Sequence, residues 1–400
     1  MTINKTSGQT LSFQNDIEAE FGTTPTRSLG SYRSSDSNFQ NKNVGTLSNL
    51  PLDSGIPTSG EIKFSDFYGK KLNMVVDYYS GGTEVKQTVG ANTMSATWRY
   101  DNQSGKVTVV GGFRTRPALN AWQGGKRIFI NVNKTLGGNK DGNMSDVALR
   151  TGVWPSGTEL QVEIGTNGKI LGAGGNGGNP SPILIGSNGS AGGNGTSALG
   201  VEYPATINNN GILRCGFGGG GGGSGVATDP NDSSIDFGRS GSGGGGGAGL
   251  PAGAGGIKGT GSFEPGNNWA QYDGQAGTGG TEDSGGTSGS ITQMVYGPNN
   301  TGYLNQDGAG CTLSSDFVQT PTQYCGLVAR GGKGGNGGDA IDPAQAGLTG
   351  VRWPRGYGPP GVGGAAGNNG KSIYYTNATV QAGSTLIGSE SGGIGVGAID

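Results

Sequence analysis

Aromatic and basic side chains in polar, turn-rich segments are the residues of this chain best suited to chemistry. The candidates are Trp269, Tyr272, Tyr296, Tyr303, Arg352, Trp353, Arg355 and Tyr357. Aromatic faces stack on sugar rings and apolar patches, and arginine forms paired hydrogen bonds with phosphate or carboxylate groups. As a group they predict a surface for noncovalent recognition. Taken one at a time, each aromatic is equally well explained as the anchor of its own loop.

Catalytic and cofactor motifs are weak in comparison. The chain has no histidine, so the commonest general base and metal ligand is missing. AAGNNGKS (365–372) fits a loose nucleotide-loop pattern, but a strand-like segment follows it where the motif needs a helix. DPNDSSID (229–236) lacks the glycine and the closing glutamate of a calcium loop. We therefore expect no enzymatic activity, no metal and no cofactor.

Composition and charge narrow the class of protein further. The net charge is −2 and no basic stripe is visible, which argues against nucleic-acid binding. No apolar run has the length of a membrane span, and MTINKTSGQT lacks a signal-peptide core. The sequence therefore predicts synthesis in a cytoplasm. Cys215, Cys311 and Cys325 are expected to be reduced thiols, with a bond between Cys311 and Cys325 as the alternative.

The elements that must position the candidate residues fall into regions of different composition. Residues 1–71 form a small module, in which Ile17 and Phe21 share one face of a short helix capped by Asn15 or Asp16. Ile62 and Phe64 alternate as in a short strand, and SDFYG resembles a capped turn. We expect this module to dock on something else, because it has few apolar residues.

Residues 72–164 favour β structure. The expected strands are 74–79, 95–101, 106–113, 126–135 and 159–164, all short and rich in β-branched or aromatic residues. Turn signals such as SGG, NQSG and QGG separate them. This spacing predicts an antiparallel β domain similar to a sandwich.

Residues 165–400 contain most of the 89 glycines of the chain. Tracts such as GGNGGN (174–179) have period three, and GTNGKILGAGGNGG (165–178) is repeated imperfectly at 208–221. A helix with three residues per turn would have two faces without side chains, on which neighbouring helices can pack. A flexible linker is the alternative for the run Gly218–Gly223. The period, the repeat and the apolar residues before each tract favour packed polyglycine-II helices that display loops.

Particular stretches resemble proteins of tailed bacteriophages. DIEAEFG (16–22) and SGEIKFSDFYGKK (59–71) are similar to a module of tail fibre and minor tail proteins. Residues 148–178 also look like tail protein sequence. The glycine tracts with interspersed loops resemble the adhesin at the tip of T-even phage long tail fibres, which implies stacked polyglycine-II helices with host-binding loops at one end. Residues 1–164 do not resemble the attachment domain of that adhesin.

The resemblance gives a specific expectation for function. It implies a tail fibre or tip protein of the virion that binds a host receptor, either a polysaccharide or an outer-membrane protein. Residues 1–71 would attach to other tail proteins, 72–164 would be a β spacer, and 165–400 would be the adhesin domain. The alternative is a purely structural tail or baseplate component. A homotrimer and a single chain on a trimeric shaft are both compatible with the resemblance.

Overall fold

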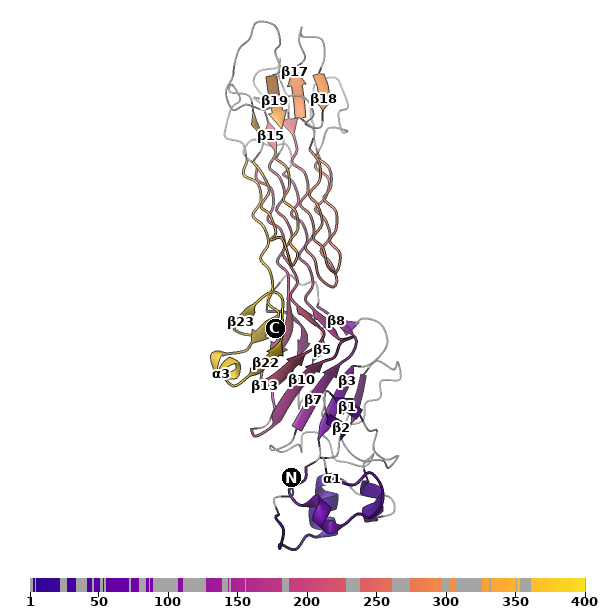
Figure 1. Ribbon diagram of the computed structural model, residues 1–400. Helices are drawn as coiled ribbons and strands as arrows, with labels where there is room; N and C mark the ends of the chain where they lie inside the picture. The colour runs from indigo at the N-terminus through magenta and orange to yellow at the C-terminus, as the bar shows by residue number, and fades with distance from the viewer. Residues whose placement is uncertain are drawn as a thin grey trace.

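The structure is a computed structural model with an elongated outline (Figure 1). The N-terminal module lies at one end, strands β15, β17, β18 and β19 lie at the other, and the C-terminus lies between them. The described residues are 3, 5–21, 27–33, 42–44, 47–50, 53, 55–71, 73–78, 84–85, 87–88, 107–110, 127–138, 143, 145–154, 156–181, 187–227, 238–260, 274–291, 293–296, 303–306, 326–330, 332–349, 351–352 and 361–399.

The N-terminal module has a small core of its own. Its short helices are η1 (Phe13–Glu18), α1 (Ala19–Phe21), η2 (Leu29–Tyr32) and η3 (Phe64–Phe67). Ile17 and Phe21 are fully buried, as their spacing predicts, while Ser12, and neither Asn15 nor Asp16, is the N-cap residue. The short strand expected at Ile62 and Phe64 is wrong, because η3 begins at Phe64.

Edge-to-face aromatic contacts hold this core together. The ring of Phe67 lies 5.7 Å from that of Phe21 and 6.0 Å from that of Tyr32. Phe13 contacts Tyr32 at 5.8 Å. The contact between Phe21 and Phe67 joins DIEAEFG to EIKFSDFYG, two segments that are far apart in the chain. The module therefore packs as a unit, since such ring pairs add stability beyond the apolar area that they bury.

A three-sided parallel β-helix follows the module. Its first sheet has the order β22-β13-β10-β7-β3-β6, its second β14-β11-β8-β4 and its third β23-β21-β12-β9-β5. The bounds are β3 Met74–Tyr78, β4 Glu84–Val85, β5 Gln87–Thr88, β6 Val107–Val110, β7 Arg127–Val132, β8 Thr135–Gly137, β9 Val147–Arg150, β10 Glu159–Ile164, β11 Lys169–Leu171, β12 Ser197–Val201, β13 Ala205–Asn209, β14 Ile212–Arg214, β21 Ile373–Tyr375, β22 Thr385–Gly388 and β23 Ile394–Val396. A hairpin, β1 (Lys42–Val44) and β2 (Leu47–Leu50), precedes it, and helix α3 (Ala378–Ala382) joins β21 to β22.

From β7 to β21, each turn of the chain contributes one strand to each sheet. For example, β7, β8 and β9 make one turn, and β10, β11 and β12 stack on it in parallel register. The inward residues of all three sheets form one buried apolar core, including Ile130, Leu136 and Leu149. A closed parallel coil buries the inner face of each strand, which fits the β-branched composition of these strands.

The antiparallel domain expected for residues 72–164 is therefore wrong. Of the described pairs in this β-helix, β3 with β6 is antiparallel and the others are parallel. The turn signals between short strands misled the prediction, because here each turn passes the chain to the next sheet of the coil. The first sheet also continues beyond residue 164, since β10 pairs with β13 and β13 pairs with β22. The strand expected at 95–101 lies outside the described residues.

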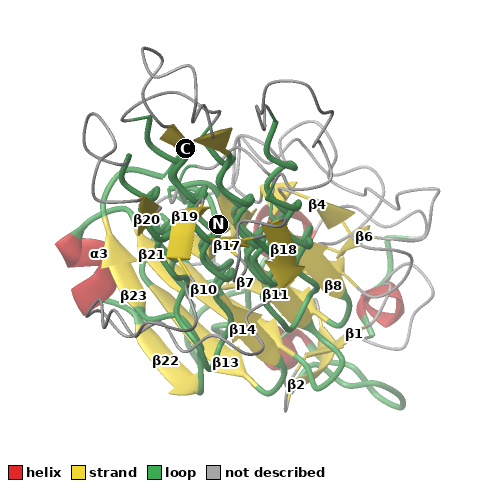
Figure 2. Ribbon diagram, turned by 90° about the horizontal axis from the view of Figure 1, so that it is seen from above, coloured by secondary structure: helices red, strands yellow, loops and turns green. Residues whose placement is uncertain are grey.

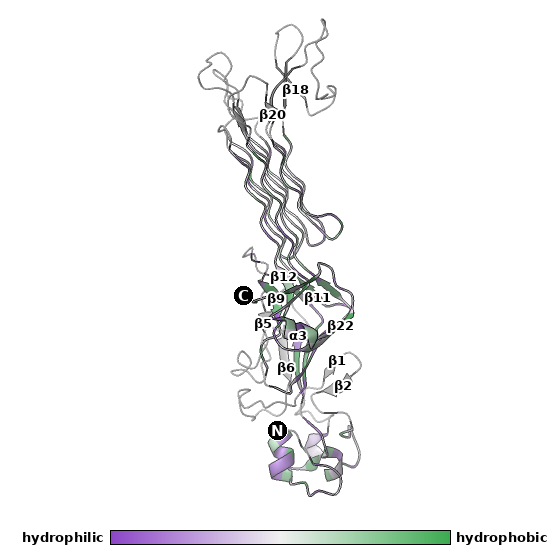
Figure 3. Cartoon of the chain, turned by 90° about the vertical axis from the view of Figure 1, so that its left-hand side faces the viewer, coloured by the Kyte–Doolittle hydropathy of each residue, from purple (hydrophilic) through white to green (hydrophobic). Residues whose placement is uncertain are grey.

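The glycine-rich part leaves the β-helix as two insertions between its second and third sheets. One insertion joins β11 to β12 and the other joins β14 to β21. Their tracts run side by side and form a shaft (Figure 3). Figure 2 looks down this shaft, so the tracts are seen end on as green loops in front of the strands. The described tracts of the shaft are 172–181, 187–196, 215–225, 239–249, 251–260, 274–281, 284–291, 332–339, 343–349 and 361–371.

Backbone hydrogen bonds between tracts repeat every third residue. The amides of Gly175 and Gly178 donate to the carbonyls of Phe217 and Gly220 at 2.8 and 2.7 Å. Each residue between them faces a different neighbour. We call this network the glycine lattice. It satisfies buried backbone groups without any strand pairing, as buried amides and carbonyls require.

The run Gly218–Gly223 lies inside the lattice and is no linker. The amides of Gly219, Gly220 and Gly221 donate to Gly193, Gly245 and Gln345, each in a different tract. Their carbonyls accept from Gly367, Gly178 and Gly335, in three further tracts. The run is thus surrounded on all sides. A Cβ atom on Gly220 would overlap the carbonyl oxygen of Gly335, so only glycine fits there.

A methyl group inside the lattice should be far more harmful than one at its surface. We expect Gly220→Ala to destabilise the chain by about 1–3 kcal/mol or more, because the neighbouring backbone cannot move aside. Gly279→Ala is the matched control, since a Cβ there lies 3.3 Å from its nearest atom, the carbonyl oxygen of Gly253. Thermal unfolding of both variants checks this, and equal losses would contradict the packing described here.

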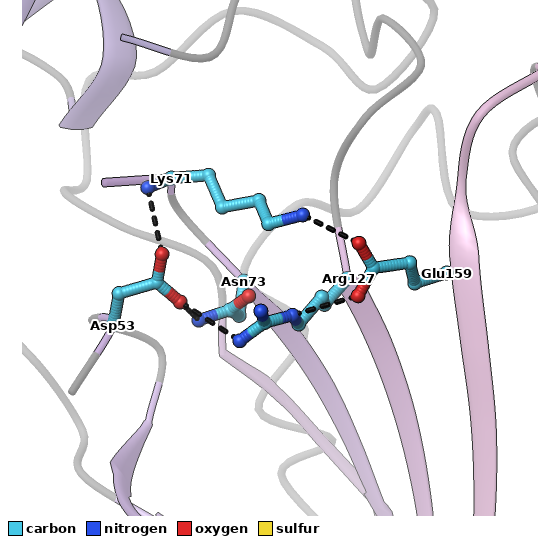
Figure 4. Close-up of polar contacts among 5 residues, drawn as sticks. All are labelled: Asp53, Lys71, Asn73, Arg127 and Glu159. Atoms are coloured by element: carbon cyan, nitrogen blue, oxygen red, sulfur yellow. Dashed lines mark hydrogen bonds and ion pairs between the residues drawn. The ribbon is translucent and has the colours of Figure 1, made fainter. Parts of the chain in front are cut away.

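A network of polar contacts joins the N-terminal module to the β-helix (Figure 4). Asp53 accepts hydrogen bonds from the Lys71 amide and the Asn73 side chain, both at 2.9 Å. Arg127, at the start of β7, contacts Asp53 at 3.3 Å and donates to Glu159, at the start of β10, at 2.8 Å. Lys71 Nζ completes the network by donating to Glu159 at 2.7 Å. The network therefore bonds the module to two successive turns of the coil.

Acid should weaken this network through Glu159. Partial burial raises its pKa, but the hydrogen bonds from Lys71 and Arg127 outweigh burial and lower the pKa below its ordinary value. A lowered folded-state pKa stabilises the fold above the unfolded-state pKa, and this contribution disappears as the pH falls through the folded-state value. Between about pH 5 and pH 3, the melting temperature of the native chain should therefore fall more steeply than that of Glu159→Gln. Parallel slopes for the two proteins would show that Glu159 does not contribute.

Candidate functional site

The end of the shaft farthest from the N-terminal module carries small antiparallel sheets (Figure 1). One is the hairpin of β15 (Val226–Ala227) and β16 (Gly238–Arg239). The other has the order β18-β17-β19-β20. Its strands are β17 Gln293–Tyr296, β18 Tyr303–Gln306, β19 Gly326–Arg330 and β20 Val351–Arg352. We call this end the tip.

Three candidate residues of the sequence analysis lie in strands of the tip. Tyr296 ends β17 and pairs in register with Tyr303, the first residue of β18. Arg352 ends β20 and pairs with Ala329. Three candidates that lie up to 56 residues apart in the chain are thus brought into one sheet. Trp269, Tyr272, Trp353, Arg355 and Tyr357 lie outside the described residues.

The flanks of those remaining candidates are described and belong to the shaft and the tip. Trp269 and Tyr272 lie between tracts 251–260 and 274–281, which are joined by a 2.8 Å bond from the Gly259 amide to the Gly274 carbonyl. Trp353, Arg355 and Tyr357 lie between β20 and tract 361–371. The chain enters and leaves both segments through fixed backbone.

Serine side chains near the tip complete the lattice where glycine alone would not. The hydroxyl of Ser242 donates to the Gly289 carbonyl at 2.7 Å and accepts from the Gly334 amide at 2.9 Å. Ser181 and Ser187 bond to each other at 2.6 Å. Sequence reasoning missed these residues. For Ser242 the signal is a small hydroxyl residue inside a glycine tract, in GRSGSGGGGG (238–247).

The opposite end of the shaft is bound to the β-helix by charged groups. Lys169 contacts Glu282 at 2.6 Å, and Arg214 contacts Asp283 at 2.8 Å. In the nearby turn, Asp339 has a lowered pKa, because the backbone amides of Asp342 and Ile341 donate to its carboxylate. These contacts close the lower turns of the shaft and hold it on the coil.

The motifs for other chemistry have ordinary structural roles where they are described. In AAGNNGKS, the amides of Gly367 and Gly370 donate to Gly219 and Gly216, so they are engaged in the lattice and do not form a phosphate cradle. Cys215 is a free and buried thiol, and burial raises its pKa to about 12. The calcium-like segment 229–236, Cys311 and Cys325 lie outside the described residues.

The described residues contain no cluster of histidine, cysteine or acidic side chains that could hold a metal ion. Within that same part of the chain, no helix is both long and apolar enough to span a membrane.

Comparison with known proteins gives a family match. The family model of the phage tail fibre adhesin Gp38 matches residues 97–395. A similar solved structure is the crystal structure of the gp37–gp38 adhesin tip complex of the bacteriophage S16 long tail fibre. It has 16% sequence identity and a TM-score of 0.31, and the alignment covers 85% of this chain and 89% of that chain. No curated protein matches the chain.

Proposed function

This chain belongs to the Gp38 family of phage tail fibre adhesins, and we propose that it binds the host surface noncovalently through side chains at the tip. The family match extends from just before β6 to β23 and includes the whole shaft. A tail fibre adhesin is a component of the virion tail that recognises the host. The proposal concerns which part of the chain makes that contact.

The observation that carries the proposal is that the candidate segments are fixed at both ends. Tyr296 and Tyr303 flank one segment and are paired in the sheet β18-β17-β19-β20. Segment 261–273 joins tracts that bond to each other, and segment 353–360 joins β20 to the lattice. Segments held in this way lose less conformational entropy on binding a receptor, which favours recognition.

We further propose that the shaft is a sandwich of polyglycine-II helices. Hydrogen bonds of period three, directed at successive neighbours, are what parallel helices with three residues per turn require. Asn176 and Asn179, three residues apart, are exposed on an outer tract, while the glycines beside them are covered. The shaft would then be a stiff frame, in which each helix rises by about 3.1 Å per residue along its axis.

Residues 1–71 are proposed to attach the chain to other tail proteins. The module has its own core, lies at the end of the molecule opposite the tip (Figure 1) and falls outside the family match. Residues 72–164 form the first turns of the β-helix, and the β-helix continues into 165–400, the proposed adhesin part. Either one chain on a trimeric fibre or a homotrimer would place the tip away from the virion.

The proposed mechanism involves no bond-breaking step. Trp269, Tyr272, Trp353 and Tyr357 would stack on sugar rings or apolar patches of the receptor. Arg352 and Arg355 would bind its phosphate or carboxylate groups. A polysaccharide and an outer-membrane protein both carry such groups, so both receptor classes fit. An enzyme that acts on the receptor is the less favoured function, because the family of this chain is described by its binding role as an adhesin.

Competition for adsorption tests this proposal. Purified chain is added to host cells before the phage that carries it, and free phage are counted. The control variant has segments 261–273 and 353–360 replaced by glycine–serine linkers of equal length, which leaves every described residue in place. We expect the intact chain to block adsorption and the variant to lose most of the block.

The alternative outcome is equally informative. If the folded intact chain neither binds cells nor blocks adsorption, the tip does not contact the receptor, and a structural role with the tip facing other virion proteins replaces this proposal. If both proteins block equally well, recognition lies elsewhere on the chain. Release of reducing sugar from host polysaccharide would point to an enzyme.

A further inference from the structure

Two outer tracts of the shaft, 187–196 and 361–371, are joined by backbone hydrogen bonds in which the amides of the first tract donate to the carbonyls of the second. The amides of Gly189 and Gly195 donate to the carbonyls of Val362 and Asn368 at 3.0 and 2.8 Å. The amides of Val362 and Asn368 point back toward tract 187–196. Both residues are exposed, and within the described part of the chain no backbone carbonyl of a further tract accepts from these amides, so they need another acceptor.

Asparagine side chains supply that acceptor. Asn188 Oδ1 accepts from the Val362 amide at 2.7 Å, and Asn194 Oδ1 accepts from the Asn368 amide at 2.9 Å. In both pairs the partners are 174 residues apart in the chain, so the two contacts are geometrically equivalent. Ala191, midway between the two asparagines, has no side-chain acceptor.

The same device recurs on another pair of outer tracts. Asn176 Oδ1 accepts from the Ala254 amide at 2.9 Å, and Asn179 Oδ1 accepts from the Ile257 amide at 3.2 Å. Here both pairs are 78 residues apart. The spacing of three matches the lattice period, so each side-chain amide stands in for a backbone carbonyl of a missing neighbour.

Glycine tracts need such contacts because their own bonds do not define a unique alignment. Each turn of a tract is nearly identical to the next, so a slip by one turn restores the backbone bonds. One turn is three residues, or roughly 9 Å along the shaft. A slip of that size would displace any segment at the end of the tract. Asparagines at particular positions distinguish the correct alignment from the slipped one.

We propose that Asn188 is a positioning residue for recognition, because its bond to the Val362 amide fixes where tract 361–371 begins at the tip. Val362 is the second described residue after segment 353–360, and Asn188 is the second after 182–186. Asn194 makes the same bond nearer the β-helix. Asn188 thus sets the height at which the chain from β20 rejoins the lattice. This inference rests on the proposed role of the tip.

The test compares Asn188→Ala with Asn194→Ala, which removes the equivalent bond between the same two tracts at a position nearer the β-helix. The readouts are adsorption block, melting temperature and hydrogen exchange at the Val362 amide. For Asn188→Ala we expect a block roughly three- to tenfold weaker and faster exchange at Val362. For Asn194→Ala we expect the block of adsorption to change by less than about twofold. The melting temperature should fall by a similar amount in both variants. Asn188→Asp should block adsorption as well as the native chain does, because a carboxylate oxygen also accepts a hydrogen bond from the Val362 amide.

The outcomes separate this inference from the proposed function. If the linker variant of 261–273 and 353–360 loses the block while Asn188→Ala keeps it, the tip binds the receptor but Asn188 does not position it. If Asn188→Ala and Asn194→Ala weaken the block equally, both residues merely stabilise the shaft and the inference fails. If Asn188→Asp does not restore the block, an acceptor at this position is not what matters. If the linker variant also keeps the block, the proposed function fails first.

Discussion

The need to satisfy backbone hydrogen bonds without side chains governs the architecture of this protein. Successive amides in the run Gly218–Gly223 donate to different tracts, and successive carbonyls accept from others, as those of Gly219, Gly220 and Gly221 do. A buried tract of this kind needs neighbouring tracts on every side that are close enough to bond, whereas an outer tract uses asparagine side chains on its open side. Side chains would hold those neighbours apart, so interior tracts are glycine, and the cost in conformational freedom is accepted for a dense and rigid frame.

The shaft depends in turn on the β-helix from which it emerges. Its insertions leave after β11 and β14 and return at β12 and β21, strands that stack on one another in the coil. Parallel stacking fixes the spacing and direction of the chain at each exit, which starts the tracts in alignment. Lys169 is the first residue of β11 and Arg214 is the last residue of β14. Their side chains bind the lower turns of the shaft through Glu282 and Asp283. The coil thus serves as the template for the lattice.

Division of labour along the molecule follows from this arrangement. The N-terminal module has an aromatic core and is joined to the coil by the Asp53, Lys71, Arg127 and Glu159 contacts, so both ends of the long axis are fixed to one frame. The lattice and the sheet at the tip fix the described flanks of the polar, aromatic segments. A frame of this kind tolerates change at the tip, which suits a protein that must recognise a host surface.

The sequence by itself determined the local features. Period three in the tracts predicted their side-by-side packing, Ile17 and Phe21 predicted a buried helix face, and the β-branched runs predicted β3, β6, β7 and β10. These follow from local geometry, because a repeat of two or three residues fixes which side of an element is bare or apolar. Only the tertiary structure decided that these strands coil in parallel, that the sheets continue past residue 164, and that Gly218–Gly223 is central while GGN tracts are peripheral. The acceptor role of Asn188 and the meeting of Tyr296, Tyr303 and Arg352 in one sheet were also decided there. Those features depend on which distant segments become neighbours, and contacts across 78 or 174 residues leave no local pattern to read.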